Sequence, residues 1–95
     1  MVVFNKKEYA LDYSEDVIVI IENKSQDIFI LNGSARYLFD NLLLQKSISS
    51  IVEEFVVNYQ IYLKDTSFET VFSDFTDIAS ELFEKGVLCN ETTTT

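Results

Sequence analysis

The pattern of apolar and polar positions changes its period near Gly33. Before this residue, apolar side chains come in short β-branched runs, the strongest of which spans residues 17–21. Consecutive β-branched residues fit a pleated sheet and crowd a helix, so this run predicts a strand. After Gly33, apolar residues recur every three or four positions, as one face of a helix requires. The chain is therefore expected to place its strands first and its helices second.

Other parts of the first half also have the character of strands. The apolar start at residues 1–5 suits an edge strand, and the polar segment after it carries alternating, half-buried positions at Tyr9, Leu11 and Tyr13. The run at residues 17–21 is continuously apolar, which fits either a central strand or one covered on both faces.

A polar turn at residues 22–27 leads into a return strand at residues 28–31. Because side chains alternate along a strand, its residues are expected on opposite faces, with Ile28 and Ile30 on one and Phe29 and Leu31 on the other. A short apolar strand at the edge of a small sheet is an open template for another chain. We therefore expect the free edge of residues 28–31 to be the working surface.

Three apolar stripes of helical spacing follow. Their members are Ala35, Leu38, Phe39 and Leu42 in the first, Ile48, Ile51, Val52, Phe55, Val56 and Tyr59 in the second, and Phe68, Val71, Phe72, Phe75, Ile78, Ala79, Leu82 and Phe83 in the third. A linker at residues 60–65 separates the last two. The third stripe is wider than the minimum needed against one core, so part of it is expected to floor a groove.

Capping residues mark the ends of these helices. Asn32 is expected to cap the first, because its side chain can accept from an amide of the first turn. Ser47 opens the second, unless the capping box at residues 50–53 sets a later start. Thr66 is expected to cap the third as the first residue of a Thr-x-x-Glu capping box, and Gly86 ends that helix in a left-handed conformation.

The order of elements predicts an α+β fold. A three-stranded antiparallel sheet is followed by three helices that pack on one face of it. Residues 1–89 are expected to form a single domain, which suits a chain of 95 residues with one core. Residues 90–95 are of low complexity and are expected to be disordered.

The charge of the chain limits its partners. Sixteen acidic residues against seven basic ones leave a formal net charge of −9. Nucleic acids and anionic membranes need a basic surface, so neither is expected to bind. The longest apolar run is too short to span a bilayer, and the N-terminus lacks the apolar stretch of a signal peptide. We expect a cytoplasmic protein.

The residue types needed for catalysis are scarce. The chain has no His, which removes the usual general base at neutral pH and the commonest metal ligand. Cys89 is the single cysteine, so neither an internal disulfide nor a cysteine-rich zinc site can form. Its neighbourhood suits a small apolar side chain better than a reactive thiol. We expect no enzymatic activity, no metal and no organic cofactor.

Several features in this order carry a family resemblance. They are the apolar run at 17–21, the strand that ends in Leu31-Asn32, a first helix with Ala35 and Phe39, the spacing Ser47-x-x-x-Ile51-Val-Glu-x-Phe55 with Tyr59, and the closing segment Leu82-Phe-Glu-Lys-Gly-Val-Leu88. Over residues 2–88 this order resembles the PqqD-like family, the recognition elements that bind leader peptides of ribosomally made, modified peptides. The chain departs from the family in its glycine-free hairpin and in Phe39, where Trp is frequent.

The resemblance implies a winged-helix-like fold and a mode of binding. A precursor's leader peptide is expected to add as an extra strand beside the third strand, against the third helix, and a separate maturation enzyme such as a protease, cyclase or radical enzyme is the implied second partner. The chain itself is expected as a monomer or weak dimer. Carried onto this sequence, the peptide-binding residues are Asp27, Ile28, Phe29, Ile30 and Leu31 from the strand and Phe68, Val71, Phe72, Asp74, Phe75 and Ile78 from the helix.

Two other functions remain open at this point. The helix order permits a winged-helix nucleic-acid binder, although Arg36 is the only arginine and no helix carries clustered bases for reading base edges. The chain can also be a structural or regulatory subunit that joins another protein through the same edge. Taken alone, a Phe-rich helical stripe is more often core than groove.

Overall fold

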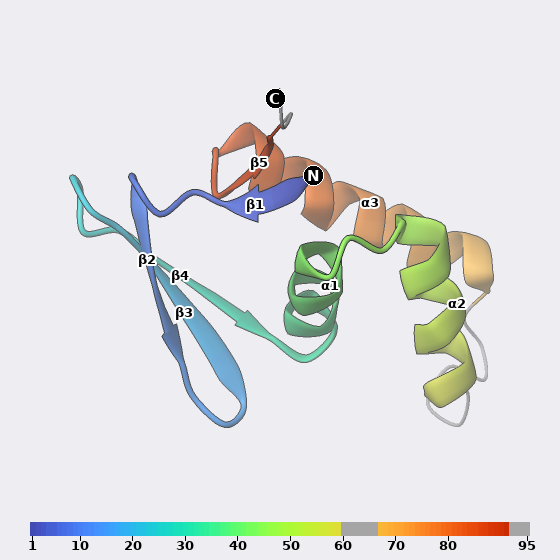
Figure 1. Ribbon diagram of the computed structural model, residues 1–95. Helices are drawn as coiled ribbons and strands as arrows, with labels where there is room; N and C mark the ends of the chain where they lie inside the picture. Colours follow the sequence, from blue (N-terminus) through green and yellow to red (C-terminus); the bar gives the residue numbers. More distant parts are fainter. Residues whose placement is uncertain (60–66, 92–95) are drawn as a thin grey trace.

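The computed structural model describes residues 1–59 and 67–91 (Figure 1). Its elements in chain order are β1 (Val2–Phe4), β2 (Tyr9–Tyr13), β3 (Val17–Glu22), β4 (Ile28–Asn32), α1 (Gly33–Leu43), α2 (Ile48–Asn58), α3 (Phe68–Glu84) and β5 (Leu88–Asn90). The predicted linker at 60–65, the predicted cap Thr66 and residues 92–95 lie outside the described residues.

The main sheet is antiparallel and has the strand order β2-β3-β4. Its register pairs Ile20 of β3 with Leu11 of β2 on one side and with Phe29 of β4 on the other. The predicted α+β class, a three-stranded antiparallel sheet followed by three helices, is confirmed. The run at residues 17–21 is the central strand, which explains its continuous apolar character. Helix α1 lies between this sheet and α2 (Figure 1).

The first strand does not join the main sheet. Instead, β1 pairs antiparallel with β5 in a separate two-stranded sheet, so the predicted edge strand at residues 1–5 belongs elsewhere in the fold. The turn at Gly86 brings the buried Val87 and Leu88 back along the chain start, which places β5 beside β1. The N-terminal ammonium of Met1 donates to the Glu91 carbonyl oxygen at 3.0 Å, and the Glu91 amide donates to the Met1 carbonyl oxygen at 2.7 Å. Residues 90 and 91, predicted to be disordered, are therefore ordered.

The core lies between the sheet and the three helices. Ile18 and Ile20 of β3, which alternate with half-buried residues, are fully buried, as β-strand geometry requires of one face. They form one apolar cluster with residues from all three helices, among which the largest or deepest are Leu38, Phe39, Ile51, Val52, Phe75 and Ala79. This cluster fixes the positions of the main sheet and α3 relative to each other.

The observed helix caps agree with some of the caps predicted from the sequence and differ from others. Ser47 caps α2, and its side chain accepts from the Ser50 amide, so the earlier of the two predicted starts is observed. The cap of α3 is Ser67, whose side chain accepts from the Thr70 amide, one residue later than the predicted cap Thr66. Asn32 occupies the N-cap position of α1, but its side chain makes no capping hydrogen bond, contrary to expectation.

Gly86 ends α3 as predicted. Its φ of +77° is left-handed, which glycine adopts without steric cost. The Gly86 amide donates to the Phe83 carbonyl, and the Val87 amide donates to the Leu82 carbonyl. These two bonds form the Schellman motif, which turns the chain sharply into β5.

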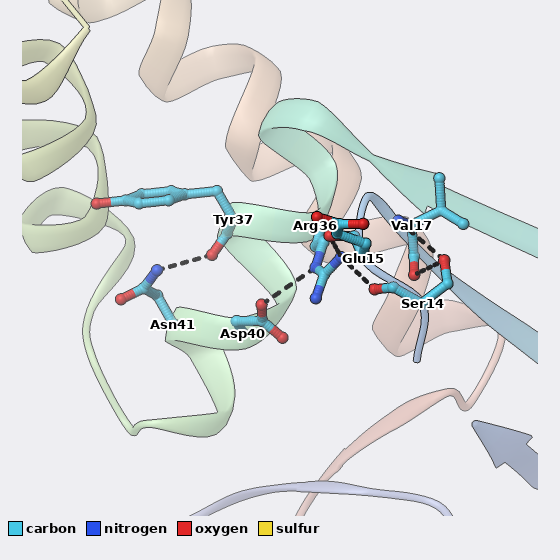
Figure 2. A network of polar contacts seen from close by, with 7 residues as sticks. All are labelled: Ser14, Glu15, Val17, Arg36, Tyr37, Asp40 and Asn41. Carbon is cyan, nitrogen blue, oxygen red and sulfur yellow. Dashed lines mark hydrogen bonds and ion pairs between the residues drawn. The ribbon is translucent and has the colours of Figure 1, made fainter. Parts of the chain in front are cut away.

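Arg36 ties the β2–β3 hairpin to the first turn of α1 (Figure 2). Its guanidinium donates to the carbonyl oxygens of Ser14 and Glu15 at 2.9 and 2.8 Å, and it lies 3.7 Å from Asp40 on the next turn. The same guanidinium sits 6.0 Å from the centre of the Tyr13 ring. The single arginine of the chain is therefore used inside the fold, to hold the hairpin against α1.

Candidate functional site

The outer edge of β4 carries main-chain groups that no other strand uses. The Glu22 amide donates to the Asp27 carbonyl, and the Asn23 amide donates to the Glu8 carbonyl on the opposite side of β3. Successive residues of an antiparallel strand alternate in the direction of their main-chain bonds. In the register of β3 with β4, this alternation directs the amide and carbonyl groups of Ile28 and Ile30 away from β3. Among the described residues, β3 is the only strand paired with β4.

The side chains of β4 alternate as predicted. Those of Ile28 and Ile30 are 60% and 61% exposed, whereas Leu31 is buried and Phe29 is half-buried on the opposite face. The edge therefore offers free main-chain donors and acceptors together with exposed apolar side chains. An exposed apolar edge of this kind is normally blocked in a folded protein, because it templates pairing with other chains.

A groove of about 360 Å³ runs between β4 and the C-terminal half of α3. No Cα atom of β4 lies within 8 Å of a Cα atom of α3, so the backbones of the two elements are not in close contact. The lining residues are Ile28, Phe29, Ile30 and Leu31 from β4, Ile78, Glu81, Leu82 and Lys85 from α3 and its C-cap, and Val87. An extended segment that pairs with β4 can therefore place alternate side chains in this groove.

The helix contributes its lining residues at regular steps. Positions 78, 81, 82 and 85 lie on one face of α3, because residues three and four apart are neighbours on a helix surface. Ile78 and Leu82 supply apolar surface, while Glu81 and Lys85 form an ion pair of 2.9 Å at the solvent side. The groove thus has an apolar floor and a charged rim.

One end of the groove is closed by Lys85. Its ammonium lies 4.4 Å from the centre of the Phe29 ring, and its carbonyl oxygen accepts from the Tyr9 hydroxyl at 2.7 Å. Burial raises the pKa of the Tyr9 phenol above its ordinary value of 10, and the carboxylates of Glu22 and Glu8 add to the rise. The phenol therefore remains a hydrogen-bond donor across the neutral range and holds the Lys85 backbone in place.

The structure brings together the strand residues of the predicted site and one residue from the helix. Ile28, Phe29, Ile30, Leu31 and Ile78 all line the groove. Asp27, which directly precedes β4, is exposed at the same end of the strand.

The five other predicted helix residues lie elsewhere. Val71 and Phe75 are buried at 5% and 2% exposure, and the Phe75 ring lies 5.2 Å from that of Phe55 on α2. Phe68 and Phe72 stack on each other with ring centres 6.0 Å apart, and Asp74 is exposed. The N-terminal half of α3 packs against α2 through Phe75, and the residues of α3 that line the groove all lie in its C-terminal half.

Sequence reasoning missed four residues of the groove. Leu82 belongs to the apolar stripe of the third helix and Val87 to the closing segment after it, but neither is among the predicted peptide-binding residues. Glu81 and Lys85 are charged, so a search for apolar periodicity does not select them. Stepping three or four residues along α3 from Ile78 finds positions 81, 82 and 85, and this is the signal that identifies them.

The residues of this site are suited to binding. Within residues 1–59 and 67–91, no three His, Cys, Asp or Glu side chains gather in a way that could hold a metal ion. Cys89 is half-buried, and its thiol donates to the Gly86 carbonyl oxygen at 3.9 Å. In the same part of the chain, no helix is long and apolar enough to cross a membrane. What the site presents is a free strand edge beside an apolar groove.

Two solved structures share this fold. TbiB1 in complex with the TbiA(beta) leader peptide superposes with a TM-score of 0.71 at 18% sequence identity, over 95% of this chain and 98% of that one. A lasso peptide synthetase B1 complexed with the leader peptide gives a TM-score of 0.75 at 16% identity, over 94% and 98%. No protein-family model and no curated protein sequence matches the chain. The chain therefore has the fold of these B1 proteins over almost its whole length.

Proposed function

We propose that this chain is a non-catalytic, PqqD-like recognition module that binds the leader of a ribosomally made precursor peptide. The leader adds as a strand along the outer edge of β4 and places alternate side chains in the groove against α3. The observation that carries this proposal is the free edge at Ile28 and Ile30, which lies directly beside the groove. The two solved structures of the same fold are themselves complexes with leader peptides, which supports it.

Strand addition accounts for both affinity and selectivity at such an edge. Main-chain hydrogen bonds provide affinity for any extended segment, while pockets for alternate side chains select among sequences. Ile28 and Ile30 together offer at most four such bonds, each worth about 0.5–1.5 kcal/mol net. Ordering a flexible peptide costs about 2–5 kcal/mol, so apolar anchors in the groove are also required. Ile78, Leu82 and Phe29 provide the surface for them.

The partner implied by this function is a separate maturation enzyme in the cytoplasm. The chain supplies no His and no clustered metal ligands among its described residues, so the chemical modification falls to that enzyme. Presenting the leader on the edge of a small domain leaves the rest of the precursor free to enter the enzyme's active site. A protease, cyclase or radical enzyme each fits this arrangement.

The nucleic-acid alternative is weakened by the position of Arg36. Its guanidinium is already bonded to the β2–β3 hairpin and lies beside Asp40 (Figure 2). An arginine that recognises a base edge needs the N–H donors of its guanidinium free to bond the base. With a formal charge of −9, the protein also repels phosphate groups.

A titration tests the proposal. The purified protein is titrated with a synthetic leader peptide taken from a short precursor reading frame next to its gene, and amide chemical shifts are followed by NMR. We expect perturbations at residues 28–31 and 78–85. Perturbations centred on α2 or on the outer edge of β2, with β4 unchanged, would overturn it. Duplex DNA is the second ligand, and sub-micromolar binding of it at physiological salt would revive the winged-helix alternative.

A further inference from the structure

Lys85 separates two hollows on this side of the molecule. One is the apolar groove beside β4, and the other is a polar hollow of about 320 Å³ at the turn end of the main sheet. The polar hollow is lined by Lys7, Glu8, Tyr9, Glu22, Asn23, Lys24 and Lys85. Lys85 is the one residue that lines both. Its side chain therefore forms the partition between them.

The backbone of Lys85 is held in place by hydrogen bonds, whereas its ammonium can change its ion-pair partner. The buried Tyr9 hydroxyl bonds the Lys85 carbonyl, and the Schellman motif at Gly86 follows at once. Among the described residues, the ammonium contacts Glu81 and the face of Phe29. The side chains of the Lys85–Glu81 pair are 42% and 63% exposed, and exposed ion pairs contribute little. A carboxylate from a bound peptide can therefore replace Glu81 as the partner of this ammonium.

The lysines at this end contrast with the charge of the whole chain. Arg36 and Lys46 form ion pairs with Asp40 and Glu54. Lys7 and Lys24, by comparison, form no ion pair within the part of the chain that the structure describes. The polar hollow thus carries three ammonium groups beside the carboxylates of Glu8 and Glu22, and Glu81 pairs with the Lys85 ammonium. Three lysines therefore gather at this end of an acidic protein.

A strand edge by itself does not define where a peptide binds. Main-chain bonds form equally well after the peptide slips by two residues, so the register must come from side chains. The apolar floor at Ile78 and Leu82 fixes one point on the peptide, and the ammonium of Lys85 is a chemically different second point. The middle of the Ile78–Leu82 floor lies five residues from Lys85, about 7.5 Å along a helix axis. Two residues of an extended strand span about 6.6 Å, which matches this separation.

We propose that Lys85 is a specificity-determining residue that reads an acidic side chain in the bound leader, two residues from the apolar anchor. The carboxylate replaces Glu81 as the partner of the Lys85 ammonium at the mouth of the polar hollow, and so fixes the register of the added strand. This inference rests on the proposed leader binding at the β4 edge.

A random-peptide display selection tests the proposed role of Lys85 without knowledge of the natural leader. Nine-residue random peptides are selected on the immobilised wild-type protein, on Lys85→Met and on Lys85→Glu. Methionine keeps the apolar stem over Phe29 and removes only the charge. We expect peptides selected on wild type to carry Asp or Glu two residues from an apolar anchor residue. Peptides selected on Lys85→Met should keep the apolar anchor but show no preference for an acidic residue. Peptides selected on Lys85→Glu should carry Lys or Arg at the acidic position. Lys46→Met, which removes an ion-paired lysine on another face, is the matched control and should select as wild type does.

Affinities measured on one enriched peptide complete the test. Replacing its acidic residue by the matching amide should weaken binding to wild type about fivefold and leave binding to Lys85→Met unchanged, because exposed charge pairs are worth about this much. Loss of peptide binding in Ile30→Pro shows that binding depends on the β4 edge. If binding depends on this edge but wild type and Lys85→Met select the same sequences, the proposed role of Lys85 is refuted, and the proposed leader binding at β4 is not. If the selection yields no peptide that depends on Ile30, the proposed function itself fails and this inference fails with it.

Discussion

The strands β1 and β4 belong to two different small sheets, and their outer edges differ. At the outer edge of β1, the Gln45 side chain accepts from the Val2 amide and donates to the Val2 carbonyl oxygen, both at 2.7 Å. One side-chain amide thus replaces a neighbouring strand. At the outer edge of β4, Ile28 and Ile30 keep their outward main-chain groups and expose their side chains. We propose the open edge of β4, which lies beside the groove, as the one that pairs with a partner chain.

The closed edge depends on a backbone conformation that glycine adopts more readily. Gln45 follows α1 with a φ of +67°, and the amides of Gln45 and Lys46 bond the carbonyls of Leu42 and Asn41 in a Schellman motif. At the end of α3, Gly86 occupies the same position in the same motif. A non-glycine residue in the left-handed region costs free energy. Gln45 offsets this cost by closing the edge of β1, which glycine cannot do.

The largest effect is expected when the open edge is blocked. Ile30→Pro removes an outward amide and places its ring where the added strand would lie. Peptide affinity measured by calorimetry should fall more than a hundredfold, because the main-chain bonds on both sides of the ring are lost. Ile30→Thr keeps the amide and the β-branched shape, so it is the matched control and should bind within a few-fold of wild type. Unchanged binding by a folded Ile30→Pro protein, judged by circular dichroism, would remove the edge from the binding mode.

A charge in the groove should have the next largest effect. Ile78→Asp places an unpaired carboxylate on the apolar floor and should cost about 2 kcal/mol of binding free energy, roughly thirtyfold in affinity. Val57→Asp on α2, at a side chain that is 69% exposed, is the control and should change neither binding nor the thermal midpoint. Equal losses in the two variants would mean that the effect is not local to the groove.

Opening the closed edge should affect stability and leave binding intact. Gln45→Met loses both bonds to Val2 and keeps the left-handed backbone, so the free energy of unfolding should fall by about 1–2 kcal/mol in urea denaturation. Gln45→Gly also loses the bonds but relieves the backbone, so its loss should be smaller by about 1 kcal/mol. Peptide affinity should stay within twofold for both variants. A large drop in affinity would show that the two edges are coupled.

Local patterns in the sequence were enough to predict the open edge. The alternation from Ile28 to Leu31, the cap at Ser47 and the left-handed Gly86 all depend on neighbouring residues, and the structure shows each of them. The face of the strand on which each side chain lies follows from its period of two.

Features that depend on long-range contacts could not be predicted in this way. The pairing of β1 with β5 joins the two ends of the chain, and no local pattern distinguishes it from an edge strand of the main sheet. The apolar stripe of α3 has one period throughout, yet α2 covers its first half, including Phe75, and β4 faces its second half, including Ile78. Gln45 at the end of α1 carries no sequence signal for a bond to Val2, which lies 43 residues earlier.

Amide hydrogen exchange, measured with and without bound peptide, tests the difference between the two edges most directly. The amides of Ile28 and Ile30 point to solvent in the free protein, whereas the Val2 amide is already bonded to Gln45. Binding of a leader as an added strand should slow exchange at Ile28 and Ile30 at least tenfold and leave the rate at Val2 unchanged. A tightly bound peptide that leaves both isoleucine amides exchanging at their free rates would contradict strand addition at β4.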